Sequence, residues 1–358
     1  MLTKTSLEFL ENFLKSSGPS GFEFEPAAVF RKYASTFADE VRTDVIGNTA
    51  AILNPDAEFK VMLAGHYDEI GFQVVYIDDN GLITFRSVGG IDKHTLPGLE
   101  VDILNGKGER IPGVIGRKPI HLQTAKERET ASEIKDLWID IGARSREEAA
   151  EIVSIGDPVA FRANCRRMGK YAIMSKGLDD KIGAFVIIEA LRLLAKKKVK
   201  VGIYAVGTVQ EELGLRGAET SSFGINPNVG IAVDVGFATD VPGVDKKTWG
   251  EVNFGDGPIL HRNADNNPVL NRIMFDMAAK KKIKYQLQCG HRATGGTDTA
   301  KIQMSRSGVA TALVSIPNRY MHTPVEICDL RDVEGAINLI AETVASFTGK
   351  ETFIPGID

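Results

Sequence analysis

Acidic residues and histidines recur in this sequence at the points where predicted strands end. The pair Glu211-Glu212 closes one long apolar run, and His66 and Asp68 follow another. In α/β proteins ligands bind at the carboxyl ends of the strands, so side chains at such positions are expected to share a site. The candidates for this site are His66, Asp68, Asp179, Asp180, Glu211, Glu212, Asp234 and His322.

The spacing of His66 and Asp68 suits a metal ligand with a supporting carboxylate. Residues two apart in an extended strand project to the same face. Imidazole is a ligand for zinc or cobalt, and a nearby carboxylate can fix the orientation of the ring. The plainer interpretation is a surface histidine beside a turn aspartate, and for this motif alone it carries the greater weight.

The two acid pairs also have ordinary explanations. Asp179 or Asp180 could cap the apolar helix that follows, where Asp is favoured over Ala by ~1 kcal/mol. Two consecutive acids exceed what a cap requires, so one could bridge two cations while the other orients it or caps the helix. Glu211 and Glu212 point in different directions in an extended or turning chain. One of them could bind a metal while the other faces the cleft as a general base.

The charges of the set favour a dinuclear metal centre. Asp234 could simply be a turn residue and His322 a loop residue. Such ordinary explanations would, however, have to be true of every residue in the set at once. Two divalent cations carry +4, while Asp179, Glu212 and Asp234 supply −3 beside two neutral histidines. A bridging hydroxide would neutralise the remainder of about +1, and such a centre lowers the pKa of bound water towards ~7. A free carboxylate beside it can pass the water proton to a leaving amine.

Composition excludes several classes of partner. The formal net charge is −4 and no basic cluster is interleaved with aromatic residues, so no nucleic-acid partner is expected. No stretch approaches the ~20 apolar residues of a membrane span, and the N-terminus lacks the apolar core of a signal peptide. Cys165, Cys289 and Cys328 are scattered and odd in number, which favours a reducing cytoplasm.

The pattern of residue types changes between about Gln73 and Asn164. Short β runs separated by turn signals fill this region, and Asn80-Gly81 is a strong hairpin signal, so a small barrel or sandwich is expected. The candidate site residues lie outside it. The simplest organisation is therefore an α/β catalytic domain of residues 1–72 and 165–358, interrupted by an inserted β domain of residues 73–164.

Local patterns predict several elements of the α/β domain. Residues 5–8, Thr-Ser-Leu-Glu, resemble a capping box at the start of the first helix. Residues 183–194 predict a buried helix and residues 201–209 a strand. Further strands are expected to end at Asp234 and near Ser315.

Taken together, the motifs resemble the M42 metallo-aminopeptidases, a family that includes the tetrahedral and glutamyl aminopeptidases. The resemblance covers nearly the whole chain, and the motifs are specific as a set although no single one is. They are Gly18-Pro-Ser-Gly-Phe-Glu23, Ala64-Gly-His-Tyr-Asp-Glu-Ile-Gly71, Val88-Gly-Gly-Ile-Asp92, Trp138-Ile-Asp-Ile-Gly-Ala143, Leu178-Asp-Asp-Lys181, Val209-Gln-Glu-Glu-Leu-Gly-Leu-Arg-Gly-Ala218, Ala232-Val-Asp-Val235, Gly295-Gly-Thr-Asp298 and Arg319-Tyr-Met-His322. Thr323 is a small departure, since serine is more usual there.

The resemblance implies a role for each candidate. One metal would be held by His66, Asp179 and Asp234, and the other by Asp179, Glu212 and His322, with Asp179 as the bridge. Glu211 would be the general base and acid, and Asp68 would orient His66. The metals would be zinc or cobalt. The implied fold is a peptidase domain with a mixed sheet flanked by helices, interrupted by a PDZ-like β domain, and the implied assembly is a dimer-based dodecamer.

The expected activity is removal of N-terminal residues from peptides with a free N-terminus. A deacylase or carboxypeptidase on the same metal framework is the nearest alternative. Endoglucanase-like activity is a further alternative, but a glycosidase needs only a carboxylate pair and leaves His66 and His322 unexplained. A non-catalytic scaffold would be expected to have lost a ligand or the base, and the sequence retains them all.

Overall fold

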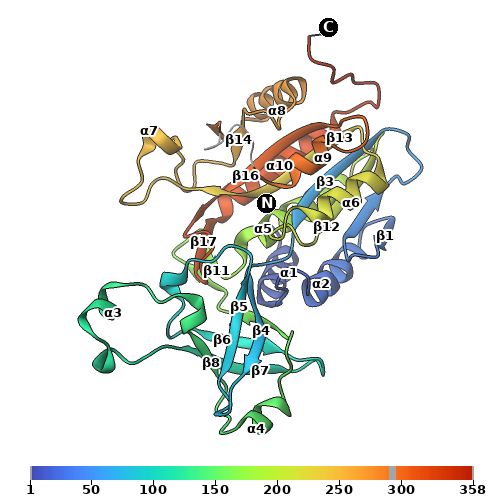
Figure 1. The fold of residues 1–358 in the computed structure, drawn as a ribbon. Helices are drawn as coiled ribbons and strands as arrows, with labels where there is room; N and C mark the ends of the chain where they lie inside the picture. The colour runs from blue at the N-terminus through green and yellow to red at the C-terminus, as the bar shows by residue number, and fades with distance from the viewer. Residues whose placement is uncertain (1, 290–295, 357–358) are drawn as a thin grey trace.

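A mixed sheet forms the centre of the larger part of the molecule, shown in Figure 1 as a computed structural model that describes residues 2–289 and 296–356. Among these residues the sheet has eleven strands, in the order β1-β2-β12-β3-β13-β16-β17-β11-β10, with β14 beside β16 and β15 beside β14. The strands are β1 (Glu40–Thr43), β2 (Thr49–Leu53), β3 (Lys60–His66), β10 (Arg166–Met168), β11 (Ala172–Ser175), β12 (Gly202–Thr208), β13 (Val229–Phe237), β14 (Ile259–His261), β15 (Gln286–Gln288), β16 (Ala310–Arg319) and β17 (Glu326–Asp329). The predicted mixed α/β fold is confirmed.

Four neighbouring strands, β12, β3, β13 and β16, run parallel through the middle of this sheet. They are buried almost throughout and read as continuous apolar runs, as expected for parallel strands covered on both faces. Thr208 of β12 lies in register with His66 of β3, and Asp234 of β13 lies in register with Ser315 of β16. The carboxyl ends of these strands therefore meet at one edge of the sheet.

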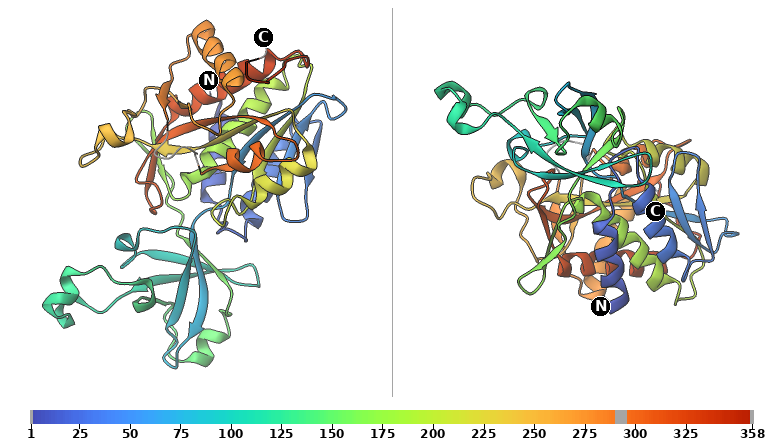
Figure 2. Two further views of the ribbon diagram at one scale, coloured as in Figure 1. Left: turned by 45° about the horizontal axis from the view of Figure 1, so that its top comes forward. Right: turned by 90° about the horizontal axis from the view of Figure 1, so that it is seen from below.

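Helices cover both faces of the sheet (Figures 1 and 2). One face is covered by α1 (Lys4–Lys15), α2 (Phe24–Ala34), α5 (Leu178–Leu194), α8 (Pro268–Lys281) and α10 (Leu330–Ala345), and the other by α6 (Arg216–Ile225) and α9 (Asp298–Gln303). The short α7 (Lys246–Trp249) lies in a loop that extends away from the sheet. Helix α5 is buried on nearly every side because it packs against the sheet, α1 and α10. None of the helices in the described ranges is long and apolar enough to cross a membrane.

A closed β-barrel projects from one end of the α/β part (Figure 2). Its strands follow the order β4-β5-β8-β7-β6-β9 and all pair antiparallel around a separate apolar core. The strands are β4 (Gly71–Ile77), β5 (Ile83–Val88), β6 (Glu100–Leu104), β7 (Arg110–Gly116), β8 (Trp138–Asp140) and β9 (Pro158–Phe161). Between them lie α3 (Ala125–Glu129), α4 (Arg146–Ala150) and the 3-10 turns η1 (Lys93–Thr95), η2 (Ile120–Leu122) and η3 (Ile134–Asp136). The expected hairpin at Asn80-Gly81 joins β4 to β5.

Some predicted boundaries were wrong. The first helix is capped by Thr3, whose hydroxyl accepts the N–H of Ser6 at 3.1 Å, and not by Thr5. Ser6 lies in the first turn of this helix, where its hydroxyl donates to the buried carboxylate of Glu189 at 2.8 Å. Strand β13 also continues three residues past Asp234, because β13 stays paired with β16 up to Phe237.

Candidate metal centre

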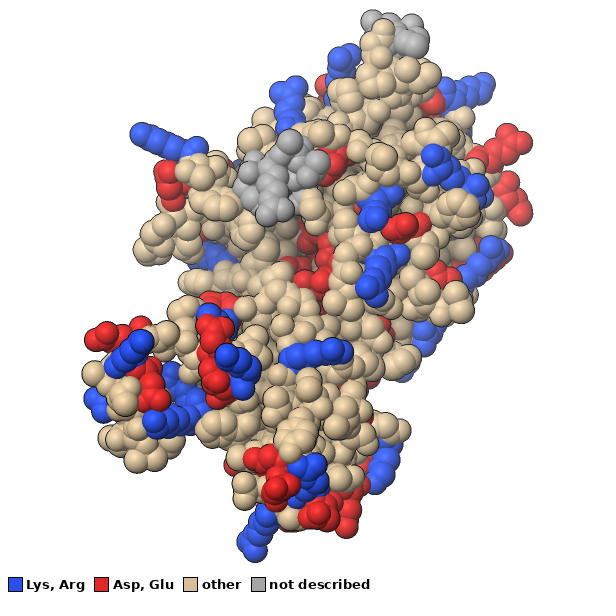
Figure 3. Space-filling view, viewed as in Figure 1, with Lys and Arg blue, Asp and Glu red and all other residues tan. Residues whose placement is uncertain are grey.

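A cavity of about 400 Å³ opens at the edge of the sheet where the parallel strands end. Figure 3 shows Asp and Glu atoms gathered in a hollow on this face of the molecule. Six of the predicted residues line the cavity, namely His66, Asp179, Glu211, Glu212, Asp234 and His322. Asp68 lies beneath them and is fully buried. The structure thus brings together residues that are spread over most of the chain.

Strand register explains why these residues converge. His66 is the last residue of β3, and its neighbour in register, Thr208, leads directly into Glu211 and Glu212. Asp234 lies on β13, the strand on the other side of β3. His322 follows the end of β16, and its backbone has a left-handed φ of 62°.

A glycine allows the start of α5 to reach the same place. A Cβ atom on Gly65 would lie 2.6 Å from the backbone nitrogen of Ala184, closer than real Cβ atoms approach other atoms. Only glycine therefore lets β3 pass so close to α5. This contact places Asp179, near the first residue of the helix, opposite His66.

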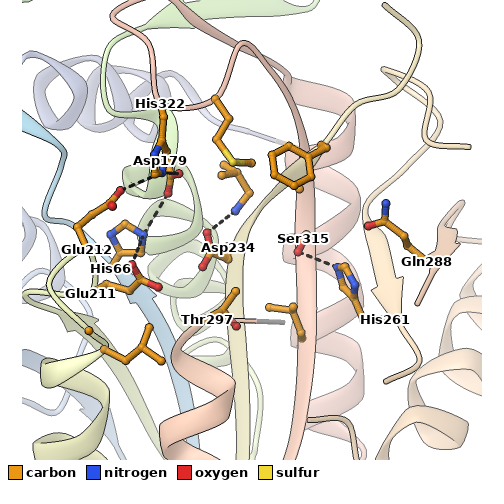
Figure 4. Close-up of a pocket in the computed structure, with 18 residues that line it drawn as sticks. His66, Asp179, Glu211, Glu212, Asp234, His261, Gln288, Thr297, Ser315 and His322 are labelled. Carbon is orange, nitrogen blue, oxygen red and sulfur yellow. Dashed lines mark hydrogen bonds and ion pairs between the residues drawn. The ribbon is translucent and has the colours of Figure 1, made fainter. Parts of the chain in front are cut away.

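The Asp179 carboxylate lies between the two histidines (Figure 4). Its Oδ1 is 3.1 Å from Nε2 of His66, and its Oδ2 is 3.3 Å from Nε2 of His322. Glu212 is on the side of His322, with Oε1 3.3 Å from the same Nε2. Glu211 is on the side of His66, with Oε2 3.9 Å from Nε2 of that ring.

Two groups of side chains have the spacing of metal ligands. One is Asp179, Glu212 and His322; the other is His66, Asp180 and Asp234. The second group contains Asp180, where the resemblance had implied Asp179. Oδ1 of Asp180 accepts the N–H of Gly183 at 3.0 Å, as a helix cap would, while its Oδ2 is buried without a hydrogen-bond partner in the described part of the chain.

The buried carboxylates of the cavity would be stabilised in their ionised form by additional positive charge. Burial raises the pKa of Glu211, Asp180 and Asp234 well above the usual range, and neighbouring carboxylates add to the effect. Hydrogen bonds to Asp179 and Glu212 raise the pKa of His322 to about 11. Buried carboxylates are stable in the ionised form only when they are paired or coordinate a metal. The unpartnered oxygen of Asp180 and the mixed histidine and carboxylate donors therefore fit divalent cations.

Asp68 makes more contacts than its predicted role required. Its Oδ1 is 3.4 Å from Nδ1 of His66, and its backbone carbonyl is 3.2 Å from the same atom. Its two carboxylate oxygens also accept the backbone N–H groups of Glu211 and Glu212, at 3.1 and 3.2 Å. Asp68 is thus placed both to orient the ring and to hold the loop that carries the two glutamates.

Two contributors were not predicted. Glu326 accepts backbone hydrogen bonds from residues of the cavity, and its only sequence signal is its position four residues after His322. The loop that follows β5 also approaches the cavity. A Cβ atom on Gly90 would lie 3.3 Å from Nδ1 of His322, and one on Gly89 would lie 3.1 Å from Oε2 of Glu212. The loop after β5 therefore passes close behind Glu212 and His322, although it does not line the cavity itself.

Comparison with known proteins shows one consistent relationship. The sequence profile of the M42 glutamyl aminopeptidases matches residues 47–339. The lysyl aminopeptidase of Pyrococcus furiosus is 39% identical over 335 residues, which cover 93% of this chain and 94% of that protein. A TET aminopeptidase from a marine-sediment Thaumarchaeota archaeon has a similar structure, with a TM-score of 0.91 and 35% identity over 96% of this chain and 97% of its own. The TET1 peptidase of Pyrococcus horikoshii, which can assemble into a tetrahedron or a large octahedral shell, has a TM-score of 0.85 and 32% identity over 96% and 100%.

Proposed function

Because this chain belongs to the M42 glutamyl aminopeptidase family, whose members hydrolyse peptides at the N-terminus, we propose that it uses two divalent cations and a glutamate base to release N-terminal residues. The observation that carries the proposal is the position of Asp179 between His66 and His322, with one carboxylate oxygen facing each ring.

We propose that Asp179 is the ligand shared by two cations. His66 and Asp234 would complete one site, and Glu212 and His322 the other. The hydrogen bond that Oδ1 of Asp180 accepts from a helix N–H supports a capping role for Asp180, while its Oδ2 faces the same cation site as His66 and Asp234. Two divalent cations held there would acidify a water molecule towards a pKa of ~7, polarise the scissile carbonyl and accept the α-amine of the substrate. Zinc or cobalt suits a donor set of imidazole and carboxylate groups.

Glu211 is proposed as the group that moves the proton. It belongs to neither of the two ligand groups, yet it lines the cavity beside His66. Burial raises its pKa well above the ordinary range of a carboxylate; His66 opposes this rise, and Asp234 adds to it. A carboxylate of raised pKa is a better proton acceptor near neutral pH, and its acid form can then protonate the leaving amine.

The rival activities account for fewer of these residues. A glycosidase would need two carboxylates and would give no role to His66 or His322. A deacylase or carboxypeptidase could use the same metal ligands, but it would act on substrates with a free carboxylate rather than a free amine. Peptides blocked at either end therefore distinguish these activities.

We further propose that the chain forms a dimer-based dodecamer in which the barrel provides contacts. The barrel carries a segment, residues 117–137, that includes α3 and extends away from the strands (Figure 1). Ile120 and Leu122 on this segment are 55% and 68% exposed, so they are available to pack against another subunit. Six antiparallel strands and the short α4 support a PDZ-like description of this inserted domain, residues 73–164. A cytoplasmic location stays a prediction from the scattered cysteines.

Metal removal and restoration test the proposed function. The protein is stripped with a chelator, and zinc or cobalt is added back while a panel of aminoacyl chromophores is screened. Activity should appear with metal and reach its maximum near two equivalents per chain. Full activity of the stripped protein, or a maximum at one equivalent, would rule out the dinuclear centre.

A further inference from the structure

Glu326 links two residues of the cavity without belonging to either ligand group. It is the first residue of β17 and only 1% exposed. Its Oε2 accepts the backbone N–H of Asp179 at 2.9 Å, and its Oε1 accepts the backbone N–H of His322 at 2.9 Å. Each carboxylate oxygen therefore holds one residue of the proposed metal centre.

The position of β17 accounts for this double contact. Strand β17 lies between β11 and β16 in the sheet, and Glu326 is in register with Ser175, the last residue of β11. The chain beyond β11 leads into α5 and Asp179, while the chain beyond β16 leads to His322. The carboxylate thus lies between the two ligand-bearing segments and contacts both.

Neither ligand residue has a backbone held by regular structure. Asp179 has φ −75° and ψ 108° inside the first turn of α5, which is not helical. His322 has a left-handed φ of 62°, which is uncommon for a residue with a side chain. A buried N–H in such a segment needs an acceptor, and Glu326 is the acceptor in both cases.

We propose that Glu326 is a positioning residue that fixes Asp179 and His322 for cation binding. It would serve that pair as Asp68 serves Glu211 and Glu212, whose N–H groups Asp68 accepts. The inference rests on the proposed function, since it assumes that Asp179 and His322 bind a cation. It adds a residue outside the donor set whose effect is exerted through two backbone N–H groups.

The two cation sites should depend on Glu326 to different degrees. Two of the three proposed ligands of the Asp179, Glu212 and His322 site are held by Glu326. At the other site only Asp179 is held by it. Replacing a group that supports metal ligands typically lowers metal affinity 10–100-fold. The larger loss is therefore expected at the site that contains His322.

The test compares Glu326→Gln with a matched control, Asp332→Asn. Asp332 is also fully buried, and it accepts two backbone N–H groups, from Gly255 at 2.8 Å and Gly257 at 2.7 Å, outside the cavity. Zinc binding is measured on both variants and the parent in buffers of defined free zinc, together with peptide turnover at each zinc concentration. A purely structural role would lower the melting temperature of both variants alike without changing zinc affinity.

Glu326→Gln should bind one zinc ion about 10–100-fold more weakly, with turnover restored by saturating zinc. Asp332→Asn should keep the parental zinc curve. If Glu326→Gln binds both ions as tightly as the control does, the positioning role is wrong although the proposed function stands. If the parent itself binds no second ion, the proposed dinuclear function is wrong, whatever the result for Glu326→Gln. Should Glu326→Gln fold poorly, Glu326→Asp, which shortens the reach to both N–H groups, gives the same comparison.

Discussion

Asp68 accepts the backbone N–H of Glu211 at 3.1 Å, and the same carboxylate lies 3.4 Å from Nδ1 of His66. One buried acid therefore connects a proposed metal ligand to the proposed proton carrier. The position of Glu211 relative to His66 is set by Asp68 as well as by the loop after β12. This arrangement makes Glu211 a residue whose chemistry can be changed without disturbing its position.

Glu211→Gln should lower turnover at least ~10²-fold while both cations stay bound, because the amide cannot accept the water proton. The backbone contact with Asp68 does not involve the side chain, so the loop should keep its place. Turnover and metal content are measured on the same samples. Glu212→Gln is the matched comparison and should lose metal, since Glu212 lies 3.3 Å from His322 in a ligand group. Parental activity in Glu211→Gln would exclude it as the base.

The two acids at the start of α5 should respond differently to substitution. Asp179→Asn should release both ions, because each loses a charged ligand and the charge that separates the cations is lost. Asp180→Asn should cost mainly stability, of order ~1 kcal/mol if Asp180 serves as a cap. Metal content after gel filtration distinguishes the two variants. Retention of both ions by Asp179→Asn, with loss in Asp180→Asn, would require the roles to be exchanged.

A buried ion cluster beside the site predicts a pH dependence of stability. Glu69 is buried and contacts Lys176 at 2.5 Å and Lys181 at 2.8 Å, and both lysines are also buried. Burial alone would raise the pKa of Glu69, but the two lysines outweigh it and lower the pKa from 4.5 to about 2. A folded-state pKa below the unfolded value adds stability above pH 4.5, and that stability is lost as pH falls through about 2.

Glu69→Gln should therefore destabilise the protein by ~3–5 kcal/mol at pH 7, since both lysines lose their buried partner. The difference from the parent should narrow as the pH falls from 4.5 towards 2. Urea unfolding at pH 7 and at pH 3 measures it. Glu127→Gln is the control, because the pKa of Glu127 is also about 2 but the residue is exposed, so little change is expected. Equal effects of the two substitutions would argue against the buried cluster.

The candidate site could be predicted because its side chains are chemically distinctive and end parallel strands. His66 and Asp234 stand at or near strand ends, and the register of β12 with β3 brings Glu211 and Glu212 beside them. Glu326 could not be predicted in this way. Its partner Asp179 is 147 positions away in the sequence. The contact is made to a backbone N–H, and any residue except proline has one, so the residue type gives no sign of the contact.

Elements of the fold that depend on neighbouring residues were also predicted, whereas features that depend on residues distant in the sequence were not. The Asn80-Gly81 turn and the apolar run of β12 are local signals, and both elements formed as expected. The predicted start of α1 was two residues late, and the hydrogen bond of Ser6 to Glu189, 183 positions away, could not be predicted from residue spacing. The approach of Gly90 to His322 could not be predicted from the sequence either, because it depends on how the barrel packs against the α/β part.

Particle size should depend on the exposed apolar residues of the barrel segment 117–137. Ile120→Ser combined with Leu122→Ser should yield smaller particles in light scattering, because the substitutions remove apolar contact area between subunits. Val45→Ser is the control, since Val45 is fully exposed on the α/β part. Zinc content and folding should be unchanged in both proteins. Unchanged particle mass in the double variant would remove this segment from the assembly proposal.

Hydrolysis of end-blocked peptides tests the central claim most directly. Tripeptides of the form X-Ala-Ala, with X varied over all side chains, are offered to the metal-restored enzyme in free, N-acetylated and C-amidated forms. An aminopeptidase should release the first residue from the free and amidated peptides and leave the acetylated ones intact. Cleavage of the acetylated peptides, or loss of cleavage on amidation, would contradict the assignment and favour a deacylase or carboxypeptidase.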